Sequence, residues 1–236
     1  SGTVILGACG GGPTSDEEVQ RALDSVNVID QTNLNDIMLT VGDPAEAVTY
    51  FKTASAQAPD RIDLKRGLAK SLIRANKPTE AVAVWTVVVN SPEGTMDDRV
   101  ELAGAYIRVN EWSKAEAELA KIPPTHETYE RYRLEAMVAD SKKQWQKADS
   151  FYEIAAGLTT TPASVINNWG FSKLTRQDYA AAERKFVEAL TYDPTMFTAK
   201  NNLILARGAQ GKYEMPVIKM TQTENAELMY TLALTA

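Results

Sequence analysis

Apolar residues recur along this chain with the spacing of one face of an α-helix, and that helical pattern itself repeats. Five alanines stand at a nearly constant interval of about 34 residues, and each is followed four residues later by a large apolar side chain. A small or aliphatic residue comes three positions further on, which completes an i, i+4, i+7 stripe. The alanines are Ala47, Ala81, Ala115, Ala148 and Ala182; the large residues are Phe51, Trp85, Leu119, Tyr152 and Phe186.

A second apolar helix is predicted about a dozen residues before each of these helices, with polar turn residues in between. Pro44 and Pro78 fall just inside the later helix of their pairs, where the missing N–H costs no hydrogen bond. A single helix pair cannot bury its own apolar face, so successive pairs must stack on one another. The pattern therefore predicts an all-α chain of stacked helix pairs.

This pattern resembles the tetratricopeptide repeat, a helix–turn–helix unit of about 34 residues. The best copy is INNWGFSKLTRQDYAAAERKFVEALTYDP, residues 166–194, and five consecutive repeats cover about 28–195. The resemblance implies a superhelical solenoid of helix–turn–helix pairs. The copy matches the family pattern at Trp169, Gly170, Tyr179, Ala182, Phe186, Ala189 and Pro194.

The pattern breaks down after the fifth repeat. The next alanine is due at position 216, which is a proline, so we expect a sixth first helix that ends near Gly211 without its partner. An extended stretch from Met215 to Met220 takes the partner's place, and Thr221 with Glu224 forms a capping box that opens a last helix. Residues 196–236 are thus expected to form a partial sixth repeat and an atypical C-terminal capping helix.

Composition and charge argue against several functions. The net charge of -6 and the pI of about 5.0 disfavour a nucleic-acid partner, and no run of about 18 apolar residues predicts a membrane span. The single histidine, His126, lies in a connection between repeats, and no clustered His or Cys residues suggest nucleophilic or zinc chemistry. We expect no enzyme activity, no cofactor, no metal site and no small-molecule substrate.

The only cysteine, Cys9, ends the sequence Leu6-Gly7-Ala8-Cys9, which resembles the lipobox of bacterial lipoproteins. The apolar run before it and the glycines after it fit a signal-peptide remnant and a flexible tether over residues 1–13, with the solenoid over 14–236. Glycine after the cysteine implies anchoring by a lipid on Cys9 to the periplasmic side of the outer membrane. An incidental free cysteine in a disordered N-terminus is the alternative.

The C-terminal sequence MPVIKMTQTENAELMYTLALTA, together with the lipobox and the repeats, resembles the TadD family. These are outer-membrane lipoproteins of the Tad, or Flp, pilus system, so the resemblance implies a pilotin that binds the pilus secretin and assists its assembly or localisation. The closest competing assignments are pilotins of type IV pili and a lipoprotein of another outer-membrane assembly machine. A soluble peptide-binding adaptor or co-chaperone, with Cys9 as a plain thiol, is the alternative from another class.

In tetratricopeptide superhelices the first helix of each pair lines the concave groove, so its polar residues are candidates for partner binding. The basic candidates suit an extended segment with carboxylates or a free C-terminus. Two asparagines, one repeat apart, can hydrogen-bond a peptide backbone. The alternative interpretation is that these residues form an ordinary solvated face that binds no ligand. The candidates are Arg66, Lys70, Arg74, Arg108, Arg133, Asn167 and Asn201.

Overall fold

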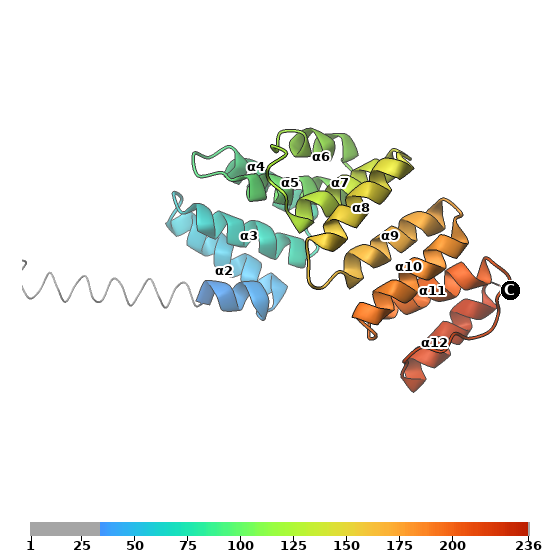
Figure 1. Ribbon diagram of the computed structural model, residues 1–236. Helices are drawn as coiled ribbons and strands as arrows, with labels where there is room; N and C mark the ends of the chain where they lie inside the picture. Colours follow the sequence, from blue (N-terminus) through green and yellow to red (C-terminus); the bar gives the residue numbers. More distant parts are fainter. Residues whose placement is uncertain (1–33, 236) are drawn as a thin grey trace, which may run out of the picture. The chain divides into compact units, whose positions relative to one another are not determined.

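The computed structural model describes residues 34–235, which form helices joined by turns and loops, with no strand among them (Figure 1). Residues 34–40 form the first described helical segment. The predicted all-α fold of helix–turn–helix pairs is confirmed. The later helices are α2 (Pro44–Gln57), α3 (Ile62–Arg74), α4 (Pro78–Val89), α5 (Met96–Arg108), α6 (Trp112–Leu119), α7 (Tyr129–Ser141), α8 (Trp145–Gly157), α9 (Ala163–Thr175), α10 (Tyr179–Tyr192), α11 (Phe197–Gly208) and α12 (Gln222–Ala233).

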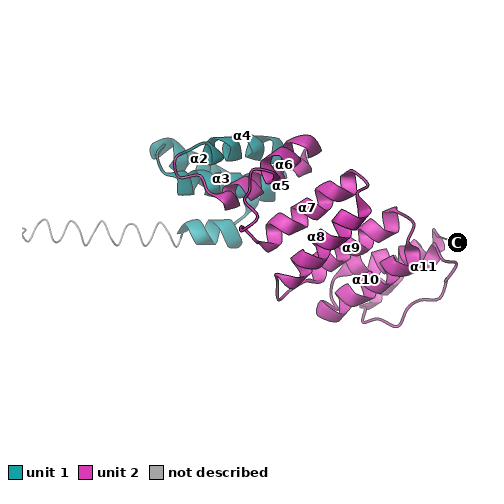
Figure 2. Ribbon diagram, turned by 45° about the horizontal axis from the view of Figure 1, so that its top comes forward, with its two compact units in different colours: residues 1–91 teal, residues 92–236 magenta. Residues whose placement is uncertain are grey.

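The chain divides into two compact units between Ser91 and Pro92 (Figure 2). Helices α2 to α4 belong to the first unit, and α5 to α12 belong to the second. The tether predicted over 1–13, the lipobox with Cys9 and the start of the first repeat lie outside the described residues. The boundary between tether and solenoid stays a prediction.

The repeat register is confirmed by burial within each unit. The five period-defining alanines are fully buried, and the large residue four positions after each is at most 2% exposed. Two glycines on first helices make room for these large side chains. A Cβ on Gly67 would lie 2.3 Å from Phe51 Cε1, and one on Gly170 would lie 2.7 Å from Phe186 Cε1.

Five first helices of the described chain end in the same left-handed turn. A residue just after each helix has a positive φ of 56 to 71°, and the following N–H donates back to a carbonyl in the last helical turn, as in a Schellman motif. The bond from Lys77 N to Leu72 O, for example, is 2.8 Å long. Only one of these turns uses glycine, so four side chains accept a conformation that L residues adopt at a cost. The positive-φ residues are Asn76, Asn110, Lys143, Gln177 and Gly211.

The C-terminal cap has the predicted form. Residues 215–220 are extended, and Thr221 and Glu224 make the expected capping box at the start of α12. Helix α12 packs against α11, Leu228 of α12 is fully buried, and Lys200 Nζ lies 3.0 Å from Glu224 Oε1. Lys200 and Glu224 lie near the starts of the two helices, and Gly208 and Thr235, which are also in contact, lie at their ends. Helix α12 therefore runs parallel to α11. The last helix thus follows a first helix directly, without the second helix that would normally separate them.

Candidate functional site

An apolar cavity opens on first helices of the second unit. It has a volume of about 320 Å³, and Met137 of α7 and Phe171 of α9 contribute to its wall. These two residues are one repeat apart and occupy the same place in successive helix pairs. Phe171 is 50% exposed, whereas core aromatics at other positions are buried. Trp112, the first residue of α6, adds a third large apolar side chain to the lining.

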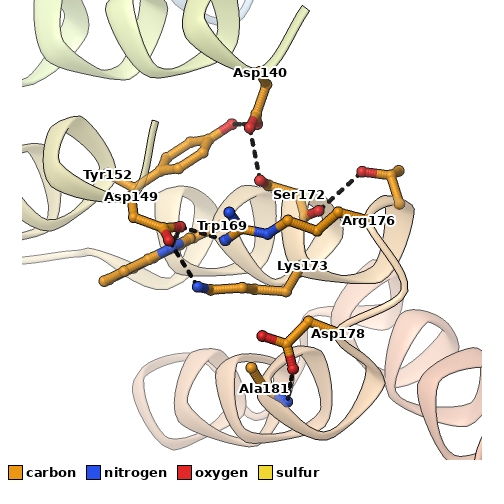
Figure 3. Close-up of polar contacts among 10 residues, drawn as sticks. Asp140, Asp149, Tyr152, Trp169, Ser172, Lys173, Arg176, Asp178 and Ala181 are labelled. Carbon is orange, nitrogen blue, oxygen red and sulfur yellow. Dashed lines mark hydrogen bonds and ion pairs between the residues drawn. The ribbon is translucent and has the colours of Figure 1, made fainter. Parts of the chain in front are cut away.

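Three polar residues of the cavity, Asp140, Tyr152 and Ser172, are hydrogen-bonded to one another. The Tyr152 hydroxyl donates to Asp140 Oδ2 and the Ser172 hydroxyl donates to Asp140 Oδ1, each at 2.7 Å (Figure 3). Burial raises the pKa of the Asp140 carboxyl, although the two hydrogen bonds act against that change. Burial and the charge of Asp140 also raise the pKa of Tyr152, so its phenol stays protonated and remains a donor. Each Asp140 oxygen therefore has a partner within the chain.

A second carboxylate, Asp149 of α8, holds α9 in place beside the cavity. It accepts from Trp169 Nε1 at 2.7 Å, from Lys173 Nζ at 2.8 Å and from the Arg176 guanidinium (Figure 3). Burial acts to raise the pKa of Asp149, but the hydrogen bonds from Arg176, Lys173 and Trp169 outweigh it and the pKa falls below its usual value. Lys185 Nζ also lies 3.7 Å from the centre of the Trp169 ring. We call Asp149, Trp169, Lys173 and Arg176 the Asp149 clamp.

The basic residues predicted for the groove differ in their availability within the first unit. The Arg74 guanidinium donates to the carbonyls of Met38 and Gly42, at 2.8 and 2.7 Å, and so caps the C-terminal end of helical residues 34–40. Lys70 is exposed and has no hydrogen bond or ion pair with any residue in 34–235, and Arg66 is half-buried. Arg74 therefore has a role in holding the preceding helical segment, which the sequence did not indicate.

In the second unit, Arg133 and Arg108 also differ. Arg133 forms a two-pronged ion pair with Glu130, at 2.9 and 2.7 Å, and its Nη1 lies 3.6 Å from Met137 Sδ. Arg108 is exposed at the end of α5 and makes no hydrogen bond or ion pair within the described part of the chain. Arg108 is thus the predicted groove cation of this unit whose charge has no carboxylate partner among those residues.

The two predicted asparagines already have partners inside the fold. Asn167 is 8% exposed, and its Oδ1 accepts from Asn202 Nδ2 at 3.1 Å. Asn201 Oδ1 accepts from the Thr231 hydroxyl of α12 at 2.8 Å. These bonds join neighbouring helices, so binding of a peptide backbone by Asn167 and Asn201 stays a prediction that would require the bonds to be shared.

Sequence reasoning missed the apolar lining of the cavity. A signal was present, because Met137 and Phe171 share one register position with Gly104 and Leu205, each one repeat from the next. Their positions in the sequence do not show that these side chains are half-exposed rather than buried in the core.

The surroundings of the single histidine bear on a metal site, and the lengths of the helices bear on a membrane span. His126 Nε2 lies 2.9 Å from Asp97 Oδ1, and no group of three potential metal ligands occurs among residues 34–235. Within the same residues, no helix is long and apolar enough to cross a bilayer.

Comparison with known proteins supports the fold. A family model described as tetratricopeptide repeat matches residues 38–87. Among solved structures, the Cut9–Hcn1 hetero-tetramer of APC/C is similar over 92% of this chain, with 16% identity and a TM-score of 0.72. This chain spans only 46% of that protein's length.

Two bacterial structures are similar as well. TTC0263, a thermophilic tetratricopeptide-repeat protein of Thermus thermophilus, has 15% identity and a TM-score of 0.64, with 74% of this chain and 95% of that chain covered. A tetratricopeptide repeat protein from Parabacteroides merdae ATCC 43184 has 15% identity and a TM-score of 0.58, with 92% and 76% covered. No curated protein matches this chain. The helix pairs, their register and these similarities together show that the chain has the tetratricopeptide-repeat fold.

Proposed function

We propose that this chain is a protein-binding adaptor and that the apolar cavity on its second unit receives part of a protein partner. The observation that carries this proposal is the exposure of Phe171 beside Met137 on neighbouring first helices. Exposed apolar side chains that gather around a cavity gain free energy when a partner removes them from water. The Asp149 clamp supports binding, because it fixes the helix that carries Phe171.

At a finer level, we propose that the adaptor is an outer-membrane lipoprotein that acts as a pilotin for the secretin of a Tad pilus. The sequence Leu6-Gly7-Ala8-Cys9 supports a lipid anchor, and the resemblance of residues 215–236 to the TadD family supports the secretin as partner. The extended stretch and the capping box give this C-terminal sequence a defined structure next to α11. The anchor would place the protein on the periplasmic side of the outer membrane.

The lipid anchor is tested by metabolic labelling with a fatty-acid analogue, on the chain expressed behind a complete lipoprotein signal sequence. We expect label on the wild type and none on Cys9→Ser, because a hydroxyl is not the acyl acceptor of this pathway. Label on both proteins, or on neither, would contradict the anchor and favour the soluble adaptor with Cys9 as a plain thiol.

The secretin is tested by affinity purification from detergent-solubilised envelope, followed by mass spectrometry. We expect a secretin to co-purify with the wild type, and also with Cys9→Ser when both proteins are mixed with solubilised envelope. A type IV pilus secretin or an outer-membrane assembly protein in its place would replace the Tad assignment. Recovery of no envelope protein would contradict the pilotin function.

A further inference from the structure

We propose that the cavity takes one large apolar side chain from an extended partner segment, and that Arg108 pairs with a carboxylate flanking that side chain. This inference rests on the proposed adaptor function and names the chemistry of its partner. The structure offers two separate observations for it. One is the composition of the cavity, and the other is an exposed arginine, without a carboxylate partner among the described residues, on the preceding first helix, α5.

The cavity is suited to an apolar side chain. Its volume of about 320 Å³ lies at the lower end of typical ligand pockets, which begin near ~300 Å³. Trp112, Met137 and Phe171 offer apolar surface, while the carboxylate of Asp140 already accepts a bond on each oxygen. A polar side chain that entered would lose water and would have to share those bonds or turn to the Asn168 amide, whereas an apolar side chain needs no such partner.

The sign of the charge expected on the partner segment follows from Arg108. This residue ends α5, and Trp112 of the cavity lining begins α6 only four residues later. Arg108 also occupies the same register position as Ser141, which lies one repeat further on and lines the cavity. Among residues 34–235 no carboxylate pairs with Arg108, although Arg133 in the same unit is paired with Glu130. A partner carboxylate that reached Arg108 would therefore complete an ion pair without displacing an internal one.

A basic partner is the competing occupant, because Asp140 carries a carboxylate in the cavity. Two features disfavour it. One is that both Asp140 oxygens already accept hydrogen bonds within the fold. The other is that a lysine in the cavity would bring a second positive charge to the first helix next to the one that carries Arg108. The acidic and basic partners are distinguished by direct binding.

The probes are fluorescein-labelled peptides of sequence Ser-Asp-Glu-X-Glu-Asp-Ser, in which X is Phe, Ala or Lys, and a neutral Phe peptide with Asn and Gln in place of the acids. Binding to the full chain is followed by fluorescence polarisation. We expect the acidic Phe peptide to bind about tenfold or more tightly than the Ala peptide, because the aromatic ring removes far more apolar surface from water than a methyl group does. We expect the neutral Phe peptide to bind about threefold more weakly than the acidic one, with a smaller dependence on salt.

Matched variants assign these effects to residues. Phe171→Ala should weaken the acidic Phe peptide about tenfold, and Val187→Ala, at an exposed valine of α10, should leave it unchanged. Arg108→Glu should weaken the acidic Phe peptide several-fold and leave the neutral one unchanged. Arg184→Glu on α10 makes the same change in net charge at an arginine away from the cavity and serves as its control.

Several results would overturn the inference. Equal binding of the Phe and Ala peptides, tighter binding of the Lys peptide, no binding of any peptide, or equal effects of a variant and its control would each do so. The secretin purification separates this failure from failure of the proposed function. A secretin retained undiminished by Phe171→Ala would reject the cavity as its site and keep the pilotin, whereas peptide binding without any secretin would keep the cavity and reject the pilotin.

Discussion

Removing the carboxylate of Asp149 is expected to loosen α9 from α8. In the Asp149 clamp this one side chain accepts from an indole N–H, an ammonium and a guanidinium, all three of which are carried by α9 or the residue that follows it. The side chains of Lys173 and Arg176 are 17% and 11% exposed, so water replaces the lost partner poorly. Asp149→Ala would leave two cations close together without the carboxylate that balances them.

The expected loss of stability is about 3 kcal/mol. A hydrogen bond to a charged group contributes about 1.5–3 kcal/mol, and breaking a buried ion pair by removing one partner costs about 3–5 kcal/mol. Asp149 itself is 28% exposed, which places the estimate at the lower end of that range. Arg176 Nε is buried and has no partner within the described residues, so the guanidinium has little alternative bonding to fall back on.

The assay is urea unfolding followed by tryptophan fluorescence, combined with hydrogen exchange of peptides from α8 and α9. The control is Asp63→Ala, which removes an ion pair with Arg61 whose two side chains are 44% and 49% exposed, and which should cost less than about 1 kcal/mol. A cost of Asp149→Ala no larger than that of this control would refute the role of the Asp149 clamp. Unchanged hydrogen exchange in α8 and α9 would refute it as well.

The pH dependence of the same variant gives a second check. The pKa of Asp149 is lowered in the folded protein, so its stabilisation is present above the pKa of an unfolded aspartate, about 3.9, and is lost as pH falls through the folded value. We expect the difference between wild type and Asp149→Ala to shrink at about pH 3. A difference of the same size at pH 3 and pH 7 would show that the cost arises from packing.

Three further predictions follow from burial and charge. Ala182→Asp should lower stability by several kcal/mol in urea unfolding, because Ala182 is fully buried and the new carboxylate would have no room or partner; unchanged unfolding would contradict the register. The raised pKa of Asp140 has the opposite sign to that of Asp149, so its contribution is largest below about pH 4 and is lost as pH rises through the folded value; the stability difference between wild type and Asp140→Asn should therefore fall over that interval, and a constant difference would refute it. Leu228→Ala should cost about 2–4 kcal/mol in the attachment of α12, detected as faster proteolysis and hydrogen exchange after Thr221, and protection equal to wild type would contradict it.

The fold could be predicted from the sequence because the repeating residues are themselves the contacts. Ala182 and Phe186 recur at their period since a small residue and a large one must meet at every helix pair, as the narrow space beside Gly170 shows. The turns carry a weaker signal. Their left-handed residues include Lys143 and Gln177, which do not mark such a conformation in the way that Gly211 does.

The sequence does not show which candidate site residues are free to bind a partner, because that depends on the neighbouring helices. Arg74 looks like an exposed groove residue in sequence, yet the carbonyls of Met38 and Gly42 lie within its reach. Asn167 is likewise bonded to a residue in the next repeat. Phe171 lines the cavity, whereas an equally apolar residue on the same helix, Ile166, is buried in the core. Periodicity in the sequence predicts where a helix lies, whereas packing against the neighbouring helices determines which of its side chains stay exposed.

The charges on first helices separate into two kinds by the same criterion. Lys200 is 2% exposed and could not remain buried without Glu224, since an unpaired buried charge would cost several kcal/mol. Arg108 is exposed, so it keeps its hydration and needs no partner for the fold to be stable. Folding therefore does not require Arg108 to form an ion pair, and a partner's carboxylate is free to replace the water around its guanidinium. In a chain with a net charge of -6, an exposed cation on the first helix that precedes the cavity gives an acidic segment a local point of attraction that the protein as a whole lacks.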